Sequence, residues 1–244
     1  MTPGPDRLFG AIHATWPAAR IWPVAGFTLR DGAGGGKRVS AATWDGDGDA
    51  LEARIDSAEA AMREAGQAPL FMVPADADAL DAALATRGYT VADPTVLWLC
   101  PVDRLTNRAV PRLTAFCVGE PLAVMREIWE AGGIGPARVQ VMERAGGPKT
   151  GLFGRTMDQP AGAGFCAVHD RIAMVHALEI AAAFRRQGLG AWMMRQAAFW
   201  AREQGAEWMA VLCTEANSGA NALYDRLRMQ RAGGYHYRMA PEAR

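Results

Sequence analysis

A glycine-containing turn beside two arginines lies in the C-terminal half of the chain, where residues 185–190 read RRQGLG. It follows an apolar stretch at 172–180 with the composition of a strand and leads into an amphipathic helix predicted at 188–204. The first N–H groups of a helix have no partner within it, and the helix dipole favours negative charge there. The turn therefore predicts a diphosphate site at a helix N-terminus. Arginines that could add charge-assisted contacts are Arg185, Arg186 and Arg195.

Other readings of such a turn stay open, because a short glycine turn also serves as a plain strand-to-helix connection or in nucleotide-dependent enzymes. The glycine cluster at 32–36 does not match a phosphate loop. Asp31 stands where that motif needs a glycine, and Arg38 stands where it needs Ser or Thr. We expect a hairpin loop there instead.

A second motif, NSGANALY at residues 217–224, follows a predicted strand at 208–213. Together the two motifs resemble the GNAT superfamily of N-acetyltransferases, with its [Q/R]-x-x-G-x-[G/A] signature after the fourth strand and its N-x-x-A-x-x-L-Y element. The resemblance covers roughly residues 112–240. The family usually has a Gly-Phe pair where Arg228 and Met229 stand here, which puts the end of that helix in doubt.

The resemblance implies that acetyl-CoA is the cosubstrate, and no metal is expected. It implies that amides of the turn hold the diphosphate and that pantetheine pairs with the preceding strand, where the fourth and fifth strands splay apart. The residues predicted to bind acetyl-CoA are Leu178, Ile180, Arg185, Arg186, Gln187, Gly188, Leu189, Gly190, Ala191 and Asn217.

Acyl transfer to an amine needs a base for the amine proton, an acid for the leaving thiolate and a donor for the oxyanion. The resemblance implies Tyr224 as the acid, and a tyrosine that merely packs its helix on the sheet is the alternative. A main-chain N–H near Ile180 is the simplest oxyanion donor. Cys213 is interpreted as a buried apolar residue, since no base is assigned to it.

The base has two candidates. Many relatives carry a glutamate early on the fourth strand, where Met174 stands here. His176 matches a position at which arylalkylamine acetyltransferases carry a histidine, a residue type suited to proton relay; a buried core histidine is the alternative. Glu179 competes for the role. Strand alternation predicts that Glu179 and His176 point to opposite faces, so that only one faces the cleft.

The acceptor amine is expected between the first two helices of the C-terminal half and the last strands. Residues that could shape this region, or that could equally serve packing, are Arg126, Trp129, Glu130, the loop 132–135, Tyr235, His236 and Tyr237.

The order of predicted elements indicates an α/β (α+β) fold with a mixed, mostly antiparallel central sheet, helices on both of its faces and a smaller α/β N-terminal domain. A polar, proline-bounded stretch at 101–111 predicts the boundary between domains 1–105 and 106–244. Residues 79–89 echo the helix-turn-strand pattern around 222–235. This echo suggests that the N-terminal domain is a degenerate GNAT-like domain, with chance similarity as the alternative.

The remaining predicted elements follow from periodicity and turn residues after a turn-rich opening up to about residue 25. Predicted strands lie at 27–30, 37–43, 70–73, 96–100, 113–118, 149–156, 163–169 and around 235–239. Predicted helices lie at 51–64, 77–86, 122–130, 137–145 and 218–227.

The 26 Lys and Arg residues balance the 26 Asp and Glu residues. The composition therefore gives no net charge that would attract nucleic acid or an anionic membrane. No apolar stretch approaches the roughly 18 residues of a membrane helix, and no signal peptide is evident. Cys100, Cys117, Cys166 and Cys213 lack metal-site spacing and indicate buried thiols in a reducing cytosol. We expect a cytoplasmic protein without nucleic-acid or membrane partners, and a homodimer stays open.

The favoured function is an N-acetyltransferase that moves an acetyl group from acetyl-CoA to a primary amine by direct attack in a ternary complex. The alternative is a non-catalytic acyl-CoA-binding sensor or partner module of the same fold. Both the enzyme and the binding module would keep the glycine turn, so the turn does not distinguish the two functions. Tyr224 and a usable base do, because only the enzyme needs them.

Overall fold

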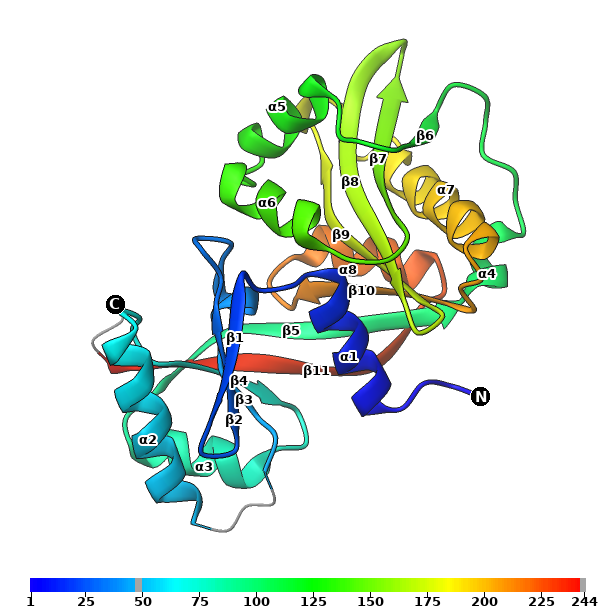
Figure 1. Cartoon of the computed structure of the whole chain (residues 1–244). Helices are drawn as coiled ribbons and strands as arrows, with labels where there is room; N and C mark the ends of the chain where they lie inside the picture. Colours follow the sequence, from blue (N-terminus) through cyan, green and yellow to red (C-terminus); the bar gives the residue numbers. More distant parts are fainter. Residues whose placement is uncertain (47–49, 242–244) are drawn as a thin grey trace. The chain divides into compact units, whose positions relative to one another are not determined.

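The computed structural model describes residues 1–46 and 50–241 (Figure 1). The chain divides into two compact units, each built from separated segments. Unit 1 comprises Met1–Pro17, Leu97–Cys213 and Asn217–Ala232, and unit 2 comprises Ala18–Val96, Thr214–Ala216 and Gly233–Arg244. The predicted boundary at 105/106 lies within unit 1, so the compact units are not two consecutive halves of the chain. The division into domains 1–105 and 106–244 stays a prediction.

Unit 1 holds most of the elements predicted for the C-terminal half. Its helices are α1 (Pro5–Thr15), α4 (Val102–Thr106), α5 (Ala123–Ala131), α6 (Pro136–Arg144), α7 (Leu189–Glu203) and α8 (Ser218–Arg226), with a short 3-10 helix, η2 (Ala182–Phe184). Its strands are β6 (Ala115–Val118), β7 (Lys149–Thr156), β8 (Gln159–His169), β9 (Ile172–Ile180) and β10 (Trp208–Thr214). Strands β6 to β9 are antiparallel neighbours, and β10 pairs with β9 in parallel.

Helices cover both faces of the unit 1 sheet (Figure 1). Gly151 of β7 lies against Met125 of α5, whereas Gly154, three residues further on, lies against Met193 of α7. Because side chains alternate along a strand, α5 and α7 occupy opposite faces. The buried residues of α7 form one apolar stripe: Leu189, Met193, Met194, Ala197, Ala198 and Ala201.

Helix α1 corrects the expectation of a turn-rich opening. Proline at its first turn is already set to helical geometry, and its buried residues recur at helical spacing: Leu8, Ala11, Ile12 and Thr15. Leu8 and Ile12 join a core cluster with Met174 of β9, so the strand position at which relatives carry a glutamate faces α1. Likewise, the predicted linker 101–111 contains α4.

Unit 2 contains a three-stranded antiparallel sheet in the order β1-β2-β3. Its elements are β1 (Arg20–Val24), β2 (Phe27–Asp31), the 3-10 helix η1 (Lys37–Val39), β3 (Thr43–Trp44), α2 (Leu51–Glu64), β4 (Leu70–Pro74) and α3 (Asp78–Thr86). The predicted strand at 37–43 is wrong, because residues 37–39 are helical. The tight hairpin forms instead at Ala25–Gly26, where both residues have positive φ, as a two-residue hairpin turn favours.

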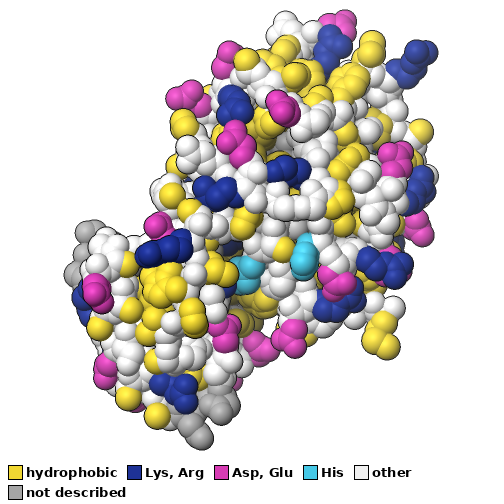
Figure 2. All heavy atoms as spheres, in the orientation of Figure 1, with side chains coloured by type: hydrophobic (Ala, Val, Ile, Leu, Met, Phe, Trp, Pro, Cys, Tyr) yellow, Lys and Arg dark blue, Asp and Glu magenta, His cyan; other side chains and the backbone are white. Residues whose placement is uncertain are grey.

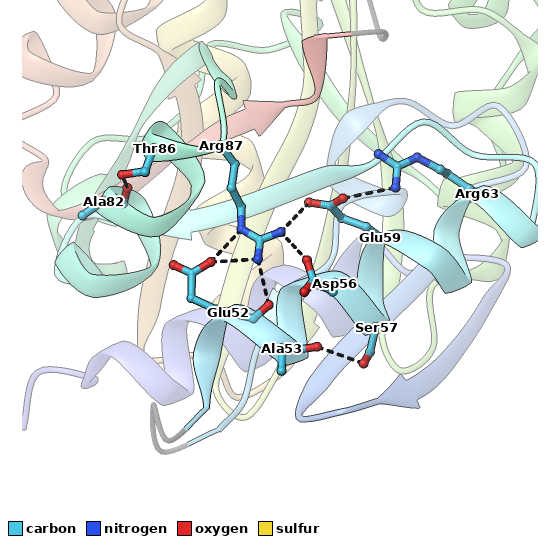
Figure 3. A network of polar contacts seen from close by, with 9 residues as sticks. All are labelled: Glu52, Ala53, Asp56, Ser57, Glu59, Arg63, Ala82, Thr86 and Arg87. Carbon is cyan, nitrogen blue, oxygen red and sulfur yellow. Dashed lines mark hydrogen bonds and ion pairs between the residues drawn. The ribbon is translucent and has the colours of Figure 1, made fainter.

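Arg87, at the C-terminal end of α3, forms ion pairs with α2 (Figure 3). Its guanidinium lies 2.7 Å from Glu52, 2.6 Å from Asp56 and 3.3 Å from Glu59, three carboxylates on α2. It also donates to the main-chain oxygen of Glu52 at 2.9 Å. Beneath the two helices lies the core of unit 2, which includes Phe27, Phe71, Ile55 and Leu84.

Two long strands, β5 (Thr90–Pro101) and β11 (Gln230–Met239), each run from one unit into the other. They belong to an eight-stranded sheet with the order β4-β11-β5-β10-β9-β8-β7-β6. Together with the small N-terminal sheet, this is an α+β fold whose main sheet is mixed and mostly antiparallel, as predicted. None of the helices in residues 1–46 and 50–241 has the length and apolarity to cross a bilayer.

The sequence echo corresponds to a repeated structural segment. Asp78 begins α3 and Ser218 begins α8, 140 positions later. In both repeats the main chain just after the helix makes the same hydrogen bond back to the helix. Tyr89 N donates to Leu84 O in the first repeat, and Met229 N donates to Tyr224 O in the second. Leu84 therefore occupies the place of Tyr224. The counterpart of Tyr89 is Met229.

Candidate functional site

A cavity of about 710 Å³ opens in unit 1 between the turn at 185–190, the end of β9 and helix α8. Of the residues predicted to bind acetyl-CoA, all but Gln187 line it. Its volume lies within the usual range for small-molecule sites. The full lining is Arg108, Leu178, Glu179, Ile180, Phe184, Arg185, Arg186, Gly188, Leu189, Gly190, Ala191, Trp192, Arg195, Asn217, Gly219, Ala220, Leu223, Tyr224, Arg226 and Leu227.

The two glycines of the turn are required for different reasons. Gly188 is the N-cap of α7 and has a φ of 85°, a backbone conformation that is strained for any residue with a side chain. No neighbouring group lies within 4 Å of the position that a Cβ would take. The space above Gly188 is thus open to a ligand. At Gly190 an added Cβ would lie 3.1 Å from Leu223, so this glycine lets α7 approach α8 closely.

The pairing of β9 with β10 covers only residues up to Val175 and Val211. The remainder of β9 therefore diverges from β10, as the predicted splay requires. The cavity reaches this diverging part of β9 at Leu178, Glu179 and Ile180.

A bulge in β9 corrects the predicted orientation of the two candidate bases. Ala163 of β8 pairs with Glu179, and Phe165, two residues later, pairs with His176. Directly paired residues share a face, so Glu179 and His176 lie on the same face of the sheet. The extra residue is accommodated around Ala177, which has a φ of 50°.

Glu179 is held inside the cavity by Arg185. Arg185 Nη2 lies 2.8 Å from Glu179 Oε1, and its Nε donates to the Ile180 carbonyl at 2.9 Å. The Glu179 side chain packs against Gly132 at the end of α5, where an added Cβ would lie 2.7 Å from it. Glu179 is therefore a cavity residue at the edge of the α5–α6 connection.

His176 lies apart from the cavity lining and is only 4% exposed. Its ring centre lies 4.9 Å from that of Trp16 and 6.3 Å from that of Phe165. His176 Nε2 lies 2.9 Å from Thr15 Oγ1, whose hydroxyl donates to Ala11 O at 2.6 Å. Since that hydroxyl has only one hydrogen, His176 donates to it through Nε2. These surroundings are those of a core histidine with a satisfied nitrogen.

Tyr224 lies on α8 with its side chain against the cavity. Burial, followed by the nearby Cys213, raises the pKa of Tyr224 well above its usual value, so the phenol stays protonated at neutral pH. Asn217 caps α8, its Oδ1 accepting from Ala220 N at 3.0 Å. Its side chain thereby fixes the helix that carries Tyr224.

Several predicted residues do not line the cavity. Trp129 is fully buried, and its Nε1 donates 2.8 Å to Ala177 O at the bulge of β9, so it supports the site without lining the cavity. Arg126 pairs with Glu143 on the surface. Gln187 donates to Ala183 O at 3.4 Å. Tyr235 and His236 belong to unit 2.

Lining residues that sequence analysis missed include Arg108 and Trp192, whose guanidinium carbon and ring centre lie 4.7 Å apart. On the face seen in Figure 2, cationic and acidic side chains are interspersed. Across the described residues, no group of three or more His, Cys, Asp or Glu could hold a metal ion.

Comparison with known families identifies the segment that carries this site. Residues 125–228 match the profile of the Acetyltransferase (GNAT) family, a range that includes the turn, β9 and Tyr224. No curated protein sequence matches the chain.

Solved structures share the fold over nearly the whole chain. A GCN5-related N-acetyltransferase from Kribbella flavida superposes with a TM-score of 0.73 at 17% identity, covering 97% of this chain and 93% of its own. A conserved protein of unknown function from Staphylococcus epidermidis gives 0.69 at 11% identity, covering 92% and 94%. A tandem GNAT protein from the clavulanic acid biosynthesis pathway gives 0.63 at 15% identity, covering 88% and 77%. The match to the family profile identifies residues 125–228 as a GNAT acetyltransferase domain.

Proposed function

We propose that the protein transfers an acetyl group from acetyl-CoA to a primary amine by direct attack in a ternary complex. One observation carries the proposal: a single cavity joins the turn at Gly188, the diverging end of β9 and the Tyr224 side chain. Those are the places where a CoA thioester needs amide donors, a strand edge and a proton donor.

The diphosphate would lie at the N-terminus of α7, where unpaired amides and the helix dipole favour an anion. Arg186 would add charge, since it also lines the cavity. The pantetheine arm would follow β9 towards Tyr224. The residues present thus fit a CoA thioester.

In the proposed reaction the neutral amine nitrogen attacks the thioester carbonyl carbon, and a C–N bond forms as the C–S bond breaks. Glu179 takes the amine proton, directly or through water, because it is the candidate base that lines the cavity. The Tyr224 hydroxyl protonates the departing thiolate. A main-chain N–H near Ile180 would stabilise the oxyanion.

The N-terminal repeat is proposed to be a degenerate GNAT-like domain without catalysis of its own. Leu84 replaces the tyrosine there, and the N-terminal half of the sequence contains no R-x-x-G-x-G motif.

Release of free thiol from acetyl-CoA in the presence of a panel of amines tests the proposal. Turnover with at least one amine is expected, and Tyr224→Phe should lower kcat by about 100-fold, within the range for a lost general acid. Binding of CoA measured by calorimetry should survive in that variant. Tight CoA binding without turnover on any amine would instead favour the sensor or partner module.

A further inference from the structure

Two arginines outside the turn at 185–190 also line the cavity. Arg108 follows α4, and Arg195 lies on the second turn of α7. Both line the cavity, as does Trp192, over which the Arg108 guanidinium lies. These two arginines are called the Arg108–Arg195 pair below.

No carboxylate pairs with either arginine anywhere in residues 1–46 and 50–241. Arg195 donates through Nη1 to Leu105 O at 3.0 Å and to Asn107 Oδ1 at 2.7 Å, both uncharged acceptors. Burial and the neighbouring charge of Arg108 lower the pKa of Arg195. Like charges held close together without a counterion destabilise each other, so the arrangement favours binding of an anion.

We propose that the Arg108–Arg195 pair binds the phosphomonoester on the ribose of the acyl-CoA, separately from the diphosphate at the turn. The inference rests on the proposed function, because it needs an acyl-CoA in the cavity. A phosphomonoester carries about −1.5 to −2 charges at neutral pH. Guanidinium groups match its oxygens in a bidentate manner, which suits a pair of arginines better than main-chain amides alone.

The spacing along α7 supports two separate phosphate positions. Arg195 lies four residues beyond Ala191, about 6 Å along the helix axis at 1.5 Å per residue. The first position would use the amides around Gly188, and the second would use side chains one turn further along. Ala191 and Trp192, which lie between Gly188 and Arg195 in the sequence, also line the cavity.

Arg108 also lies outside the segment that matches the family, residues 125–228. Helix α4 positions it, and the last turn of α4 is itself fixed to α7 through the bond from Arg195 to Leu105. A segment that the sequence presents as a linker thus contributes to ligand selection. The pair would discriminate CoA from analogues that lack only the ribose phosphate.

Calorimetry with CoA and with 3′-dephospho-CoA, on the full chain, tests the proposal. The wild type should bind CoA about tenfold more tightly, the loss expected for a charged hydrogen-bonded contact. Arg108→Gln should weaken CoA binding about tenfold and change 3′-dephospho-CoA binding by less than about twofold. Because Arg108 is exposed, the variant should keep the melting temperature of the wild type.

Arg202→Gln is the matched control. Arg202 also lies on α7 and contacts α4, donating to Thr106 Oγ1 at 3.2 Å, but it does not line the cavity. The Arg202→Gln variant should bind CoA and 3′-dephospho-CoA with the same affinities as the wild type.

Equal affinity of the wild type for both compounds would overturn the role of the Arg108–Arg195 pair while leaving the proposed function intact. So would an Arg108→Gln variant that weakens both compounds alike. Binding of neither compound would refute the proposed function itself, and the proposal for the pair with it.

Discussion

Arg185 and Glu179 form an ion pair inside the cavity, with Nη2 and Oε1 2.8 Å apart. The same guanidinium holds the Ile180 carbonyl. The arginine expected to contact phosphate and the carboxylate expected to take the amine proton are therefore directly linked. A ligand phosphate that draws Arg185 away would leave Glu179 free to act as a base.

Exchange of each candidate base separates their roles. Glu179→Gln should lower kcat by about 100-fold at an unchanged melting temperature, because it removes the proton acceptor in the cavity. His176→Gln should keep kcat within a few-fold and lower the melting temperature, since it disturbs a buried ring that bonds Thr15 at 2.9 Å. Steady-state kinetics and thermal unfolding of both variants provide the comparison. Loss of turnover in His176→Gln without loss of stability would contradict this assignment.

Cys213 should take no covalent part in transfer. Burial raises the pKa of its thiol to about 11, so at pH 7.5 the protonated, poorly nucleophilic form dominates. Cys213→Ala should therefore keep kcat. Mass spectrometry after mixing the enzyme with acetyl-CoA should show no acetylated Cys213, and initial rates should give the intersecting lines of a ternary complex. Parallel lines and an acetylated Cys213 would refute direct attack.

The conformation of Gly188 provides a test of the diphosphate position. Gly188 and Gly205, at opposite ends of α7, have φ of 85° and 80° and open space around them. Alanine at either site should cost about 1–2 kcal/mol of stability, because a side chain disfavours that backbone region. Only Gly188→Ala should also weaken CoA binding, since Gly205 lies outside the cavity lining. Equal effects of both variants on CoA affinity would argue against a diphosphate at Gly188.

Much of the local structure follows from sequence periodicity. The predicted spans of α2, β7 and β9 agree with those observed, because helical spacing in α2 and short strand-like runs in β7 and β9 are bounded there by turn residues. Helix α1 was missed because two Trp-Pro pairs, Trp16-Pro17 and Trp22-Pro23, favour extended segments nearby, although the burial pattern of α1 is helical.

The site was predictable where it depends on main-chain geometry and not where it depends on packing. The glycine turn and Tyr224 are encoded locally. The bulge at Ala177 depends on how β9 pairs with β8 and on the bond from Trp129, so strict alternation assigned Glu179 to the wrong face. Arg108 reaches the cavity only because α4 packs on α7, a tertiary relationship without a sequence signature.

A final prediction concerns acid stability of unit 2. Asp81 of α3 receives bonds from Arg238 Nε and Nη2, each at 2.7 Å, and lies 2.6 Å from His236 Nε2. The Arg238 bonds, with His236, lower the pKa of Asp81 from 3.8 to about 2. Because the pKa of Asp81 is lower in the folded than in the unfolded protein, the ionised carboxylate stabilises the folded protein at pH values above the unfolded-state pKa. This stability is lost as the pH falls through the folded-state pKa.

The window for this loss therefore runs from 3.8 down to about 2. Asp81→Asn should lower the free energy of unfolding by about 1–2 kcal/mol at pH 7, as expected for partly buried charged hydrogen bonds. Asp78→Asn, on the same helix, should cost at most about 0.5 kcal/mol through the helix dipole. Urea unfolding at pH 7 and pH 3 measures both variants. The difference in the free energy of unfolding between wild type and Asp81→Asn should be smaller at pH 3 than at pH 7. An equal difference at both pH values would show that it arises from packing and not from the Asp81 charge.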